Sequence, residues 1–431
     1  MTPPADDFAR VLWAHTAAPP PPVPPLGGDV ACAVAIVGAG ILGLATALAL
    51  AERGVRVIVL EAAAIGAGAS GRNGGLVVPS LPRIGPEASP PRLAAMVASG
   101  ADAVFALIRR HRIECDAAQS GWLYPAHAAS MVRHLAARIA AWQAAGARCV
   151  WLDAAETRRR MGSAAFHGAL FDESGGHLDP LGYTRGLARA ALAAGAAIHA
   201  ATPVTALARD GAGWRLTTPH GTVYADRVLA AVNTMPPGLP GPASVVPLLI
   251  YQMATPVMPD SARRAVLAGN EACSDTRNNL LACRWTAEGR LVTGGMAALQ
   301  AGAITRLPRR LARRLEIVFP GLGPVRFEHV WRGRAALTGD FLPRLAEPAP
   351  GLVSAVACNG RGIVLSTVLG PALAAYLAAG DAASLPLPLT RLRPVPLPAL
   401  ARLLPQVLLP LGDWQDRRAE RARPPSATGP R

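Results

Sequence analysis

The sequence predicts an α/β fold in which a domain built on a parallel sheet is interleaved with a mixed α+β domain. Three blocks, near residues 33, 177 and 351, each combine an apolar strand, a glycine-containing turn and a helix. Strands that are apolar along their whole length are typical of parallel sheets covered on both faces. Because the blocks lie far apart in the sequence, separated segments must build the parallel sheet, and the segments between them must build the other domain.

The first block reads AVAIVGAG, ILGLATALALAERG and VRVIVLE: a strand, a helix that Gly54 ends, and a second strand that ends at Glu61. Gly38, Gly40 and Gly43 have the G-x-G-x-x-G spacing. The first glycine permits a tight turn, the second a close approach to a pyrophosphate, and the third close packing of helix on strand. The helix N-terminus offers free N–H groups to the phosphates, and the acidic residue accepts hydrogen bonds from ribose. The block therefore predicts a Rossmann-like dinucleotide site.

The uncharged stretch Ala33–Ala51 is also about as long as a membrane-spanning helix. Its GAGILG turn and the β-branched residues before that turn favour a buried strand followed by a helix, so we expect no transmembrane segment. The first residues, MTPPADDFAR, lack a basic region followed by an apolar one and are not typical of a signal peptide.

The second block continues the alternation. Asp179 is a good N-cap with Pro180 in the first turn, and the helix is predicted to run to about Ala194, where Gly195 ends it. AAIHA, PVTALARD and GWRLTTPHGTVYADRVLAAVN follow as strands, the later ones antiparallel. The third block, GLVSAVACNGRGIVLSTVLGPALAAYLAAGD, is again a strand, a glycine turn and a helix.

The blocks divide the chain into four predicted parts, two of them discontinuous. The sequence between the blocks is mostly helical up to about residue 165 and strand-rich after about residue 246. The parts are a Pro-rich N-terminal arm (1–30), a nucleotide-binding domain (31–84, 166–245 and 326–385), a substrate domain (85–165 and 246–325) and a partly disordered C-terminal extension (386–431).

The composition is strongly basic, with a formal net charge of +15, yet the chain contains no lysine. A basic chain suggests nucleic acid or an anionic membrane as a partner. The arginines are scattered apart from short clusters at Arg158–Arg160, Arg309–Arg314 and Arg417–Arg423, so a charge-balancing surface is favoured and nucleic-acid binding is not expected. Without lysine, a Schiff-base enzyme and a phosphate-loop lysine are excluded.

The six cysteines form no C-x-x-C pair, and their spacing fits no zinc site, so we expect no metal. Buried, reduced thiols in a cytoplasmic protein are the default interpretation. The cysteines are Cys32, Cys115, Cys149, Cys273, Cys283 and Cys358.

A glycine-rich stretch, GAGASGRNGG (Gly66–Gly75), replaces the ordinary next helix after Glu61. It is either a flexible loop or a backbone shaped to lie against a flat ligand. A second glycine turn, NGRG (Asn359–Gly362), follows a strand near the end of the chain. A large flavin held in extended form would touch both places, so FAD is favoured over NAD.

With these motifs, the chain resembles the D-amino-acid oxidase/glycine oxidase superfamily of FAD-dependent amine oxidoreductases. IGAGASGRNGG is most similar to the gamma-glutamylputrescine oxidase group. The resemblance covers roughly residues 10–385 and includes GALFDESGGHLDPLGYTRGLARAA, DTRNNLLACRWTAEGRLVTGG, WRGRAALTGDFLP and CNGRGIVLS.

The resemblance implies a role in FAD binding for sixteen positions. The GAGILG turn would hold the pyrophosphate, and Glu61 would bind the adenosine ribose. The glycine-rich stretch would lie against the pyrophosphate and the flavin ring. Val204 would offer its backbone to the adenine, and the NGRG turn would reach the pyrimidine edge of the flavin. The positions are Gly38, Ala39, Gly40, Ile41, Leu42, Gly43, Glu61, Ser70, Arg72, Asn73, Gly74, Val204, Gly360, Arg361, Gly362 and Ile363. For Arg72 a surface ion pair is the alternative interpretation.

Several departures from the family pattern narrow the expected function. Gly66–Gly75 contains no His, and the family's Cys attachment position falls near Gly333, so the FAD is expected to be non-covalent. Relatives that oxidise amino acids grip the substrate carboxylate with an Arg whose position here is Ala335. Arg334 would point to the opposite face of a strand. An amine of the polyamine-derivative type therefore fits better than a free α-amino acid.

The electron acceptor stays open. The family's G-H-G-F-K lysine position is Val364 here, and no lysine is available to promote reaction with oxygen. Oxygen, a quinone and a carrier protein are all compatible with the sequence. We predict Tyr251 and Arg284 as pocket residues, although a structural role fits each equally well. His329 and Trp331, at the edge of a late strand, are expected to be structural.

The C-terminal RLRPVPLPALARLLPQVLLPLGDW is apolar with interspersed arginines. It would lie on a membrane surface or pack across the body, and packing is favoured because its prolines (Pro394, Pro396, Pro398, Pro405 and Pro410) interrupt an amphipathic helix.

The sequence thus predicts an amine-oxidising FAD enzyme. The alternatives are a D-amino-acid dehydrogenase that passes electrons to a quinone, an RNA-modifying flavoprotein and a non-catalytic flavin-binding assembly factor.

Overall fold

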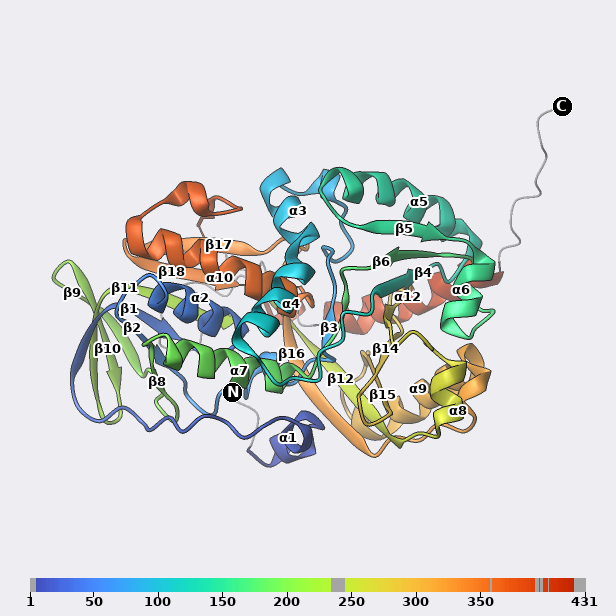
Figure 1. Cartoon of the computed structure of the whole chain (residues 1–431), viewed down its shortest axis with the longest axis horizontal. Coiled ribbons are helices and arrows are strands. Elements are labelled where there is room, and N and C mark those ends of the chain that lie inside the picture. Colours follow the sequence, from blue (N-terminus) through green and yellow to red (C-terminus); the bar gives the residue numbers. More distant parts are fainter. Residues whose placement is uncertain are drawn as a thin grey trace.

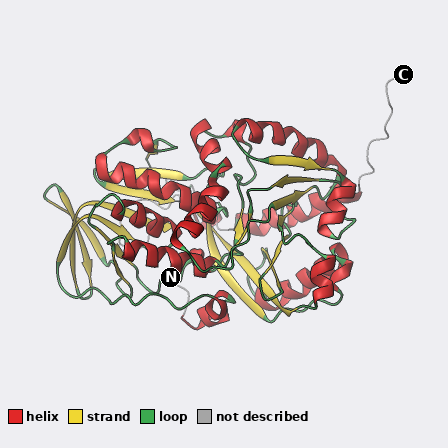
Figure 2. Cartoon of the chain, viewed as in Figure 1, coloured by secondary structure: helices red, strands yellow, loops and turns green. Residues whose placement is uncertain are grey.

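The computed structural model describes residues 5–233, 245–356, 359–391, 395, 398–401 and 403–421. Two large sheets divide the molecule into two halves (Figures 1 and 2). The predicted α/β class is confirmed, and so are the parallel sheet and the mixed second sheet. Cys358 and residues 422–431, for which we expected a buried thiol and disorder, lie outside the described residues.

The first sheet has a parallel core. Its strand order is β19 (Leu389–Thr390), β17 (Arg344–Ala349), β18 (Leu352–Val356), β11 (Gly221–Asn233), β1 (Val30–Val37), β2 (Val57–Leu60) and β8 (Ala197–His199). β18, β11, β1, β2 and β8 are parallel neighbours. β10 (Gly213–Thr218) and β9 (Ala206–Asp210) extend from β11 as antiparallel strands, as predicted.

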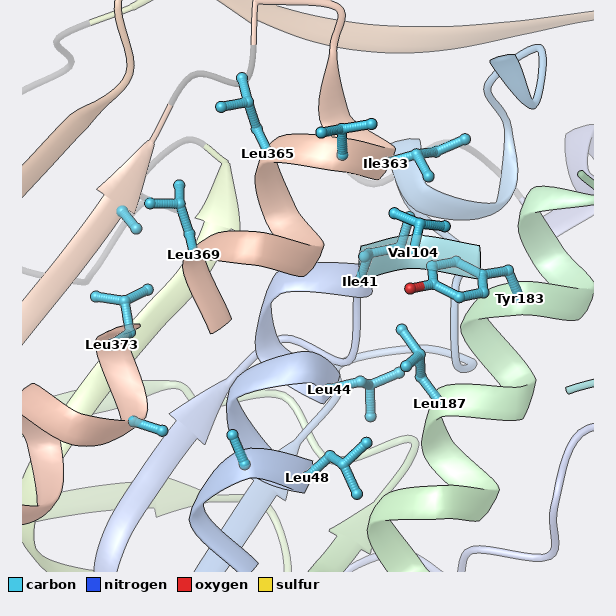
Figure 3. Close-up of a cluster of buried hydrophobic side chains, with 14 of the residues drawn as sticks. Ile41, Leu44, Leu48, Val104, Tyr183, Leu187, Ile363, Leu365, Leu369 and Leu373 are labelled. Atoms are coloured by element: carbon cyan, nitrogen blue, oxygen red, sulfur yellow. The ribbon is translucent and has the colours of Figure 1, made fainter. Parts of the chain in front are cut away.

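Three helices cover one face of this sheet: α2 (Ile41–Ala51), α7 (Pro180–Ala193) and α10 (Gly362–Ala379). Figure 3 shows their buried side chains meeting, with Ile41, Leu44 and Leu48 of α2 between α7 and α10. α2 and α10 approach so closely that a Cβ at Gly370 would lie 2.7 Å from the Ala45 Cβ. The stretch Ala33–Ala51 is therefore a strand and a core helix.

The second sheet has the order β16 (His329–Leu337), β12 (Val246–Val257), β15 (Arg290–Gly295), β14 (Ala282–Trp285), β13 (Ala272–Ser274), β4 (Trp122–Pro125), β6 (Ala169–Asp172) and β5 (Cys149–Leu152). The predicted boundaries place β6 and β16 in the nucleotide-binding domain, but both belong to this sheet. β6 pairs with β4 and β5, and β16 pairs with β12 along its whole length. Backbone pairing, which the sequence pattern does not show, decides their membership.

Helices surround both halves. They are α3 (Pro91–Ala98), α4 (Gly100–His111), α5 (Ala129–Ala144), α6 (Ala154–Met161), α8 (Asp260–Ala265), α9 (Ala303–Val318), α11 (Pro398–Ala401) and α12 (Leu404–Arg421), with the short α1 (Trp13–Thr16) in the arm. Short 3-10 helices (η1–η5) occupy Ala5–Arg10, Ala69–Gly71, Pro86–Ala88, Pro320–Leu322 and Ala382–Ser384, and β3 (Leu76–Val77) pairs with β7 (Gly176–His177).

Among the described residues, α10 is the one helix that is long and apolar enough to span a membrane. The pair α3 and α4, which are bent by 47° relative to each other, would also be long and apolar enough if the two formed one broken span. α10 is more than half buried, and it packs against α2 and α4. Core packing thus accounts for its apolar composition.

The prediction that prolines interrupt a helix in the C-terminal segment is wrong for residues 404–421, which form one helix in spite of Pro405 and Pro410. Pro405 lies in the first turn, where its missing N–H loses no helical hydrogen bond, and a single interior proline at Pro410 removes only one.

Candidate functional site

The turn between β1 and α2 requires glycine at each position of the G-x-G-x-x-G pattern. Gly38 has φ +108°, a conformation that disfavours other residues. A Cβ at Gly43 would lie 2.1 Å from the Gly38 carbonyl oxygen, and a Cβ at Gly40 would lie 2.8 Å from Ser70 Oγ. The helix can therefore begin directly against the end of the strand.

Hydrogen-bond donors converge at the N-terminus of α2, and the first turn of the helix contains no acidic residue. Ser70 Oγ accepts from the Ile41 N–H at 3.0 Å. The Glu61 carboxylate, at the end of β2, accepts from the N–H groups of Ala39 (2.8 Å) and Ala63 (2.9 Å). Burial raises the pKa of Glu61 above its ordinary value. The turn thus places the positive N-terminal end of α2 next to the Glu61 carboxylate at the end of β2.

The glycine-rich stretch Gly66–Gly75, which we call the glycine loop, has a defined shape. Asn73 Nδ2 donates to the Ser70 carbonyl at 2.8 Å, and Asn73 Oδ1 accepts from the Gly75 N–H at 2.9 Å. A Cβ at Gly71 would lie 2.4 Å from the Gly66 oxygen, and one at Gly75 would lie 2.0 Å from the Leu178 oxygen. Internal contacts therefore order the loop, and glycine is needed where backbones touch.

Three side chains from distant segments hold the glycine loop by its carbonyl oxygens. Trp331 Nε1 donates to Arg72 O at 2.8 Å, and Trp13 Nε1 donates to Asn73 O at 2.8 Å. Arg284 Nε donates to the next carbonyl, Gly74 O, at 2.9 Å. The loop is thus tied to the arm, to the edge strand β16 and to the interior strand β14 of the second sheet.

Arg284 is fully buried. Besides Gly74, its guanidinium donates to the carbonyls of Leu178 (2.8 Å) and Trp285 (3.1 Å), and it lies 4.7 Å from the Trp13 ring centroid. Burial lowers its pKa to about 10. These contacts are structural, and the predicted catalytic role of Arg284 stays a prediction.

Arg72, in the middle of the glycine loop, is 4% exposed. Its Nε donates to the Ala67 carbonyl at 2.8 Å, and its guanidinium lies 5.0 Å from the Phe8 ring centroid. The side chain therefore packs between the loop and the arm.

The second glycine turn stands at the N-terminus of α10. Asn359, with φ +50°, accepts from the Thr338 N–H at 2.8 Å and so fixes the turn to the end of β16. Gly360 has φ +82°, and a Cβ there would meet nothing within 4 Å. Arg361 provides no side-chain cap, and no acidic residue occupies the first turn of α10. The N-terminus of α10, a helix that packs against α2, is therefore a second candidate position for a ligand.

Arg361 extends away from this turn toward the second sheet, where it lies 5.7 Å from the Trp122 ring centroid. Its Nε finds no acceptor among the described residues, and burial lowers its pKa to about 10. The side chain lines a cavity of about 10 Å³, roughly the room of one water. The other lining residues are Pro79, Ser80, Leu81, Trp122, Tyr124, Leu135, Arg138, Trp142, Cys149, Leu170 and Asp172.

β16 has the alternation that the sequence predicts. Trp331 and Ala335 are buried, whereas Arg332 and Arg334 are exposed. Trp331 faces the glycine loop, and a Cβ at Gly333, on the same side, would lie 3.4 Å from the Arg72 Cβ. The face of β16 toward the loop therefore carries Ala335 and not Arg334.

Tyr251 and His329 lie apart from the loop. The Tyr251 hydroxyl donates to Gln300 Oε1 at 2.9 Å, and its ring packs with Leu307 and Leu311 of α9. The predicted catalytic role of Tyr251 stays a prediction. The His329 ring centroid lies 5.4 Å from that of His15 in the arm, and burial lowers the pKa of His329.

The family of FAD dependent oxidoreductases named DAO matches residues 33–376 of the chain, which include both glycine turns, the glycine loop and β16. The chain belongs to this family. It is therefore an FAD-dependent oxidoreductase, as the resemblance implied.

Two proteins similar to this DAO-family chain are each 30% identical to it. A probable oxidoreductase OrdL of Rhizobium meliloti matches 87% of this chain and 90% of its own length. The gamma-glutamylputrescine oxidoreductase of Escherichia coli matches 84% of this chain and 87% of its own length. Among solved structures, the glycine oxidase of Geobacillus kaustophilus has a TM-score of 0.69 at 24% identity, covering 80% of this chain and 94% of that one.

The described residues fit FAD. Gly360 and Gly68 both border open space, because a Cβ on either would meet nothing within 4 Å. The two helix N-termini, neither of which has an acidic residue in its first turn, suit a pyrophosphate and a ring that becomes negative. Val204 lies near the end of β2, because the N–H of Thr202, two residues before it, donates to the backbone carbonyl of Glu61 at 2.8 Å. The individual roles of the sixteen predicted positions stay predictions.

Sequence reasoning named Arg284 and Trp331 but missed that they hold the glycine loop from outside, together with Trp13. His177 completes this set: its Nε2 donates to Asn270 O at 3.0 Å, and its Nδ1 faces Arg284 Nη1 at 3.5 Å. No local pattern marks Trp13, His177 or Arg284, because their shared target is assembled from distant segments.

Proposed function

We propose that this DAO-family enzyme oxidises a primary or secondary amine, of the polyamine-derivative type, to an imine that water then hydrolyses. The donor would be a CH–NH or CH–NH₂ group. The name of the 30%-identical gamma-glutamylputrescine oxidoreductase supports this substrate class. The observation that carries the proposal is Ala335: the side of β16 toward the glycine loop has no guanidinium to grip a carboxylate on the reacting carbon.

Bound FAD would supply a two-electron acceptor for the hydride that leaves the α-carbon of the neutral amine. The chain itself supplies binding and electrostatics. The N-terminus of α10 would stabilise negative charge on the ring. The glycine loop holds its shape through Trp331, Trp13 and Arg284. Loss of the hydride leaves an iminium cation, which keeps its N–H protons or loses one of them to water to give the imine, so no side chain needs to act as a base.

We propose that the FAD is non-covalent and that the enzyme is cytoplasmic. The glycine loop contains no His, and Gly333 stands where some relatives carry the attachment Cys. Precipitation of the purified yellow protein with acid should release all the flavin into the supernatant. Flavin that stays with the pellet, or a peptide carrying flavin mass, would contradict this part of the proposal.

The substrate test uses the purified enzyme under anaerobic conditions with a panel of amines, polyamine derivatives and D-amino acids. Bleaching of the flavin by amines, but not by D-amino acids, is the expected result. Bleaching by D-amino acids alone would support the D-amino-acid dehydrogenase instead. If no compound bleaches the flavin, the assembly factor is supported, and salt-dependent RNA binding would support the RNA-modifying alternative.

The acceptor is tested in the same experiment, by admitting air or a quinone analogue to the reduced enzyme. Val364 packs under α4, where a Cβ at Gly100 would lie 2.4 Å from it, and the chain contains no lysine. Faster reoxidation by the quinone analogue would identify a dehydrogenase, and rapid reoxidation by air an oxidase.

A further inference from the structure

The C-terminal helix α12 packs on the rest of the chain through its charged face. Asp413 accepts from Arg310 at 2.6 Å, and Asp416 accepts from the Asn278 side chain at 2.8 Å. Glu420 accepts from Arg277 Nε at 2.8 Å. All three acidic residues of the helix are therefore used in contacts with the body.

The opposite face of α12 is apolar and turned to solvent. Seven of the thirteen exposed large apolar side chains among the described residues lie between positions 400 and 414. The five that belong to α12 recur every three or four residues and form one stripe along the helix. The seven are Leu400, Leu403, Leu404, Val407, Leu408, Leu411 and Trp414, with exposed fractions from 45% to 65%. Single exposed apolar residues are ordinary, but a continuous row indicates a binding surface.

The exposed charges beside this stripe are positive. Arg417, Arg418 and Arg421 follow it on the same helix and are exposed, and the Arg418 guanidinium lies 5.6 Å from the Trp414 ring centroid. Because the acidic residues face inward, the outer side of α12 combines an apolar stripe, a tryptophan and three arginines. This combination suits the interface of an anionic bilayer.

We propose that this face of α12, together with Leu400 and Leu403 just before the helix, binds the surface of a membrane that contains anionic lipid. The apolar side chains lie at the boundary of the acyl chains, and the arginines contact the headgroups. A second copy of the chain is a poorer occupant, since a two-fold contact would bring the same arginines together on chains of net charge +15. The proposal does not depend on the flavin chemistry.

The test is flotation of the FAD-loaded enzyme with vesicles of phosphatidylcholine alone or mixed with phosphatidylglycerol. We expect binding to the mixed vesicles only, and release at high salt. The variant Leu411→Gln with Trp414→Gln should weaken binding by about tenfold or more, because it removes buried apolar area at the interface. Replacing Arg417, Arg418 and Arg421 by Gln should weaken it by up to about a hundredfold, because each arginine near the surface contributes about fivefold.

Val257→Gln is the matched control, because Val257 of β12 is as exposed as Trp414, at 57% and 55%. It should float like the parent enzyme. Amine oxidation in solution should be unchanged in every variant, because the substituted residues are exposed and lie outside the candidate site. The Trp414 fluorescence, obtained by difference from Trp414→Phe, should be quenched by lipids labelled in the acyl chain.

Three results would overturn the proposal. One is the absence of binding to both kinds of vesicle, and another is equal binding of the parent and of the Leu411→Gln, Trp414→Gln variant. The third is a dimer that forms without lipid and becomes monomeric in the same variant, since the face would then join two copies of the chain.

Discussion

The indole rings of Trp13 and Trp331 pack edge to face with their centroids 5.8 Å apart. Each donates a hydrogen bond to a carbonyl of the glycine loop, Trp331 to that of Arg72 and Trp13 to that of the next residue, Asn73. One indole comes from the N-terminal arm and the other from β16. The arm is thereby joined to the edge strand of the second sheet through the loop that FAD would contact.

Replacement of Trp331 by Phe should destabilise the protein and weaken FAD binding. The Arg72 carbonyl would lose its buried donor, which costs about 1–3 kcal/mol in the free energy of unfolding. Thermal unfolding and FAD titration measure the two effects. Trp414→Phe is the control, because Trp414 is exposed and should leave both unchanged. An unchanged FAD affinity in Trp331→Phe would show that the loop does not need this donor.

Arg284→Lys should separate a structural role from a catalytic one. A lysine cannot reach the Gly74, Leu178 and Trp285 carbonyls together, so we expect a lower melting temperature and weaker FAD binding, while kcat at saturating FAD stays within a few-fold. Arg334→Lys, on the exposed face of β16, is the control. A large fall in kcat with unchanged stability would instead support the predicted place of Arg284 in the pocket.

Two glycine substitutions should have opposite effects. Gly43→Ala would place a Cβ 2.1 Å from the Gly38 oxygen and should abolish FAD binding and lower stability, by about 1–3 kcal/mol or more. Gly68→Ala meets nothing within 4 Å and should leave the melting temperature of the FAD-free protein unchanged. If Gly68→Ala loses FAD affinity while its melting temperature is unchanged, the cofactor must pass beside Gly68.

An arginine at Ala335 should shift the substrate preference toward α-amino acids. Ala335→Arg would place a guanidinium on the face of β16 toward the glycine loop, and the ratio of kcat/KM for an amino acid to that for the corresponding amine should rise about tenfold or more. Ala335→Met, which adds bulk without charge, is the control. A similar ratio in both variants would mean that this face of β16 does not contact substrate.

His177 should make the protein less stable in mild acid. Burial and the charge of Arg284 lower its pKa from 6.5 to about 3, so the folded protein keeps His177 neutral while the unfolded chain binds a proton below about pH 6.5. Stability therefore rises with pH between these values, by at most about 1.4 kcal/mol per pH unit from this group. In His177→Gln the melting temperature should fall less between about pH 7 and pH 5, whereas the exposed His134→Gln should match the parent. A parent-like acid profile in His177→Gln would exclude this group as the cause.

The sequence by itself determined the α/β class, the first strand–turn–helix unit and the family. These depend on local patterns: glycine spacing, apolar strands, and an N-cap at Asp179, which accepts from the Leu181 and Gly182 N–H groups as predicted. The alternation in β16 also showed that Ala335 and Arg334 would face opposite sides, because a strand turns successive side chains to opposite faces.

Only the tertiary structure decided which strands join which sheet, what holds the glycine loop and which face of α12 is exposed. β6 and β16 belong to the second sheet through pairing with strands distant in the sequence. Trp13 and His177 both contact Arg284 although the three residues lie far apart in the sequence, and no sequence spacing encodes these contacts. The prolines of residues 404–421 argued against an amphipathic helix, yet α12 forms, and ion pairs to Arg310 and Arg277 turn its charged face inward and leave its apolar face outside.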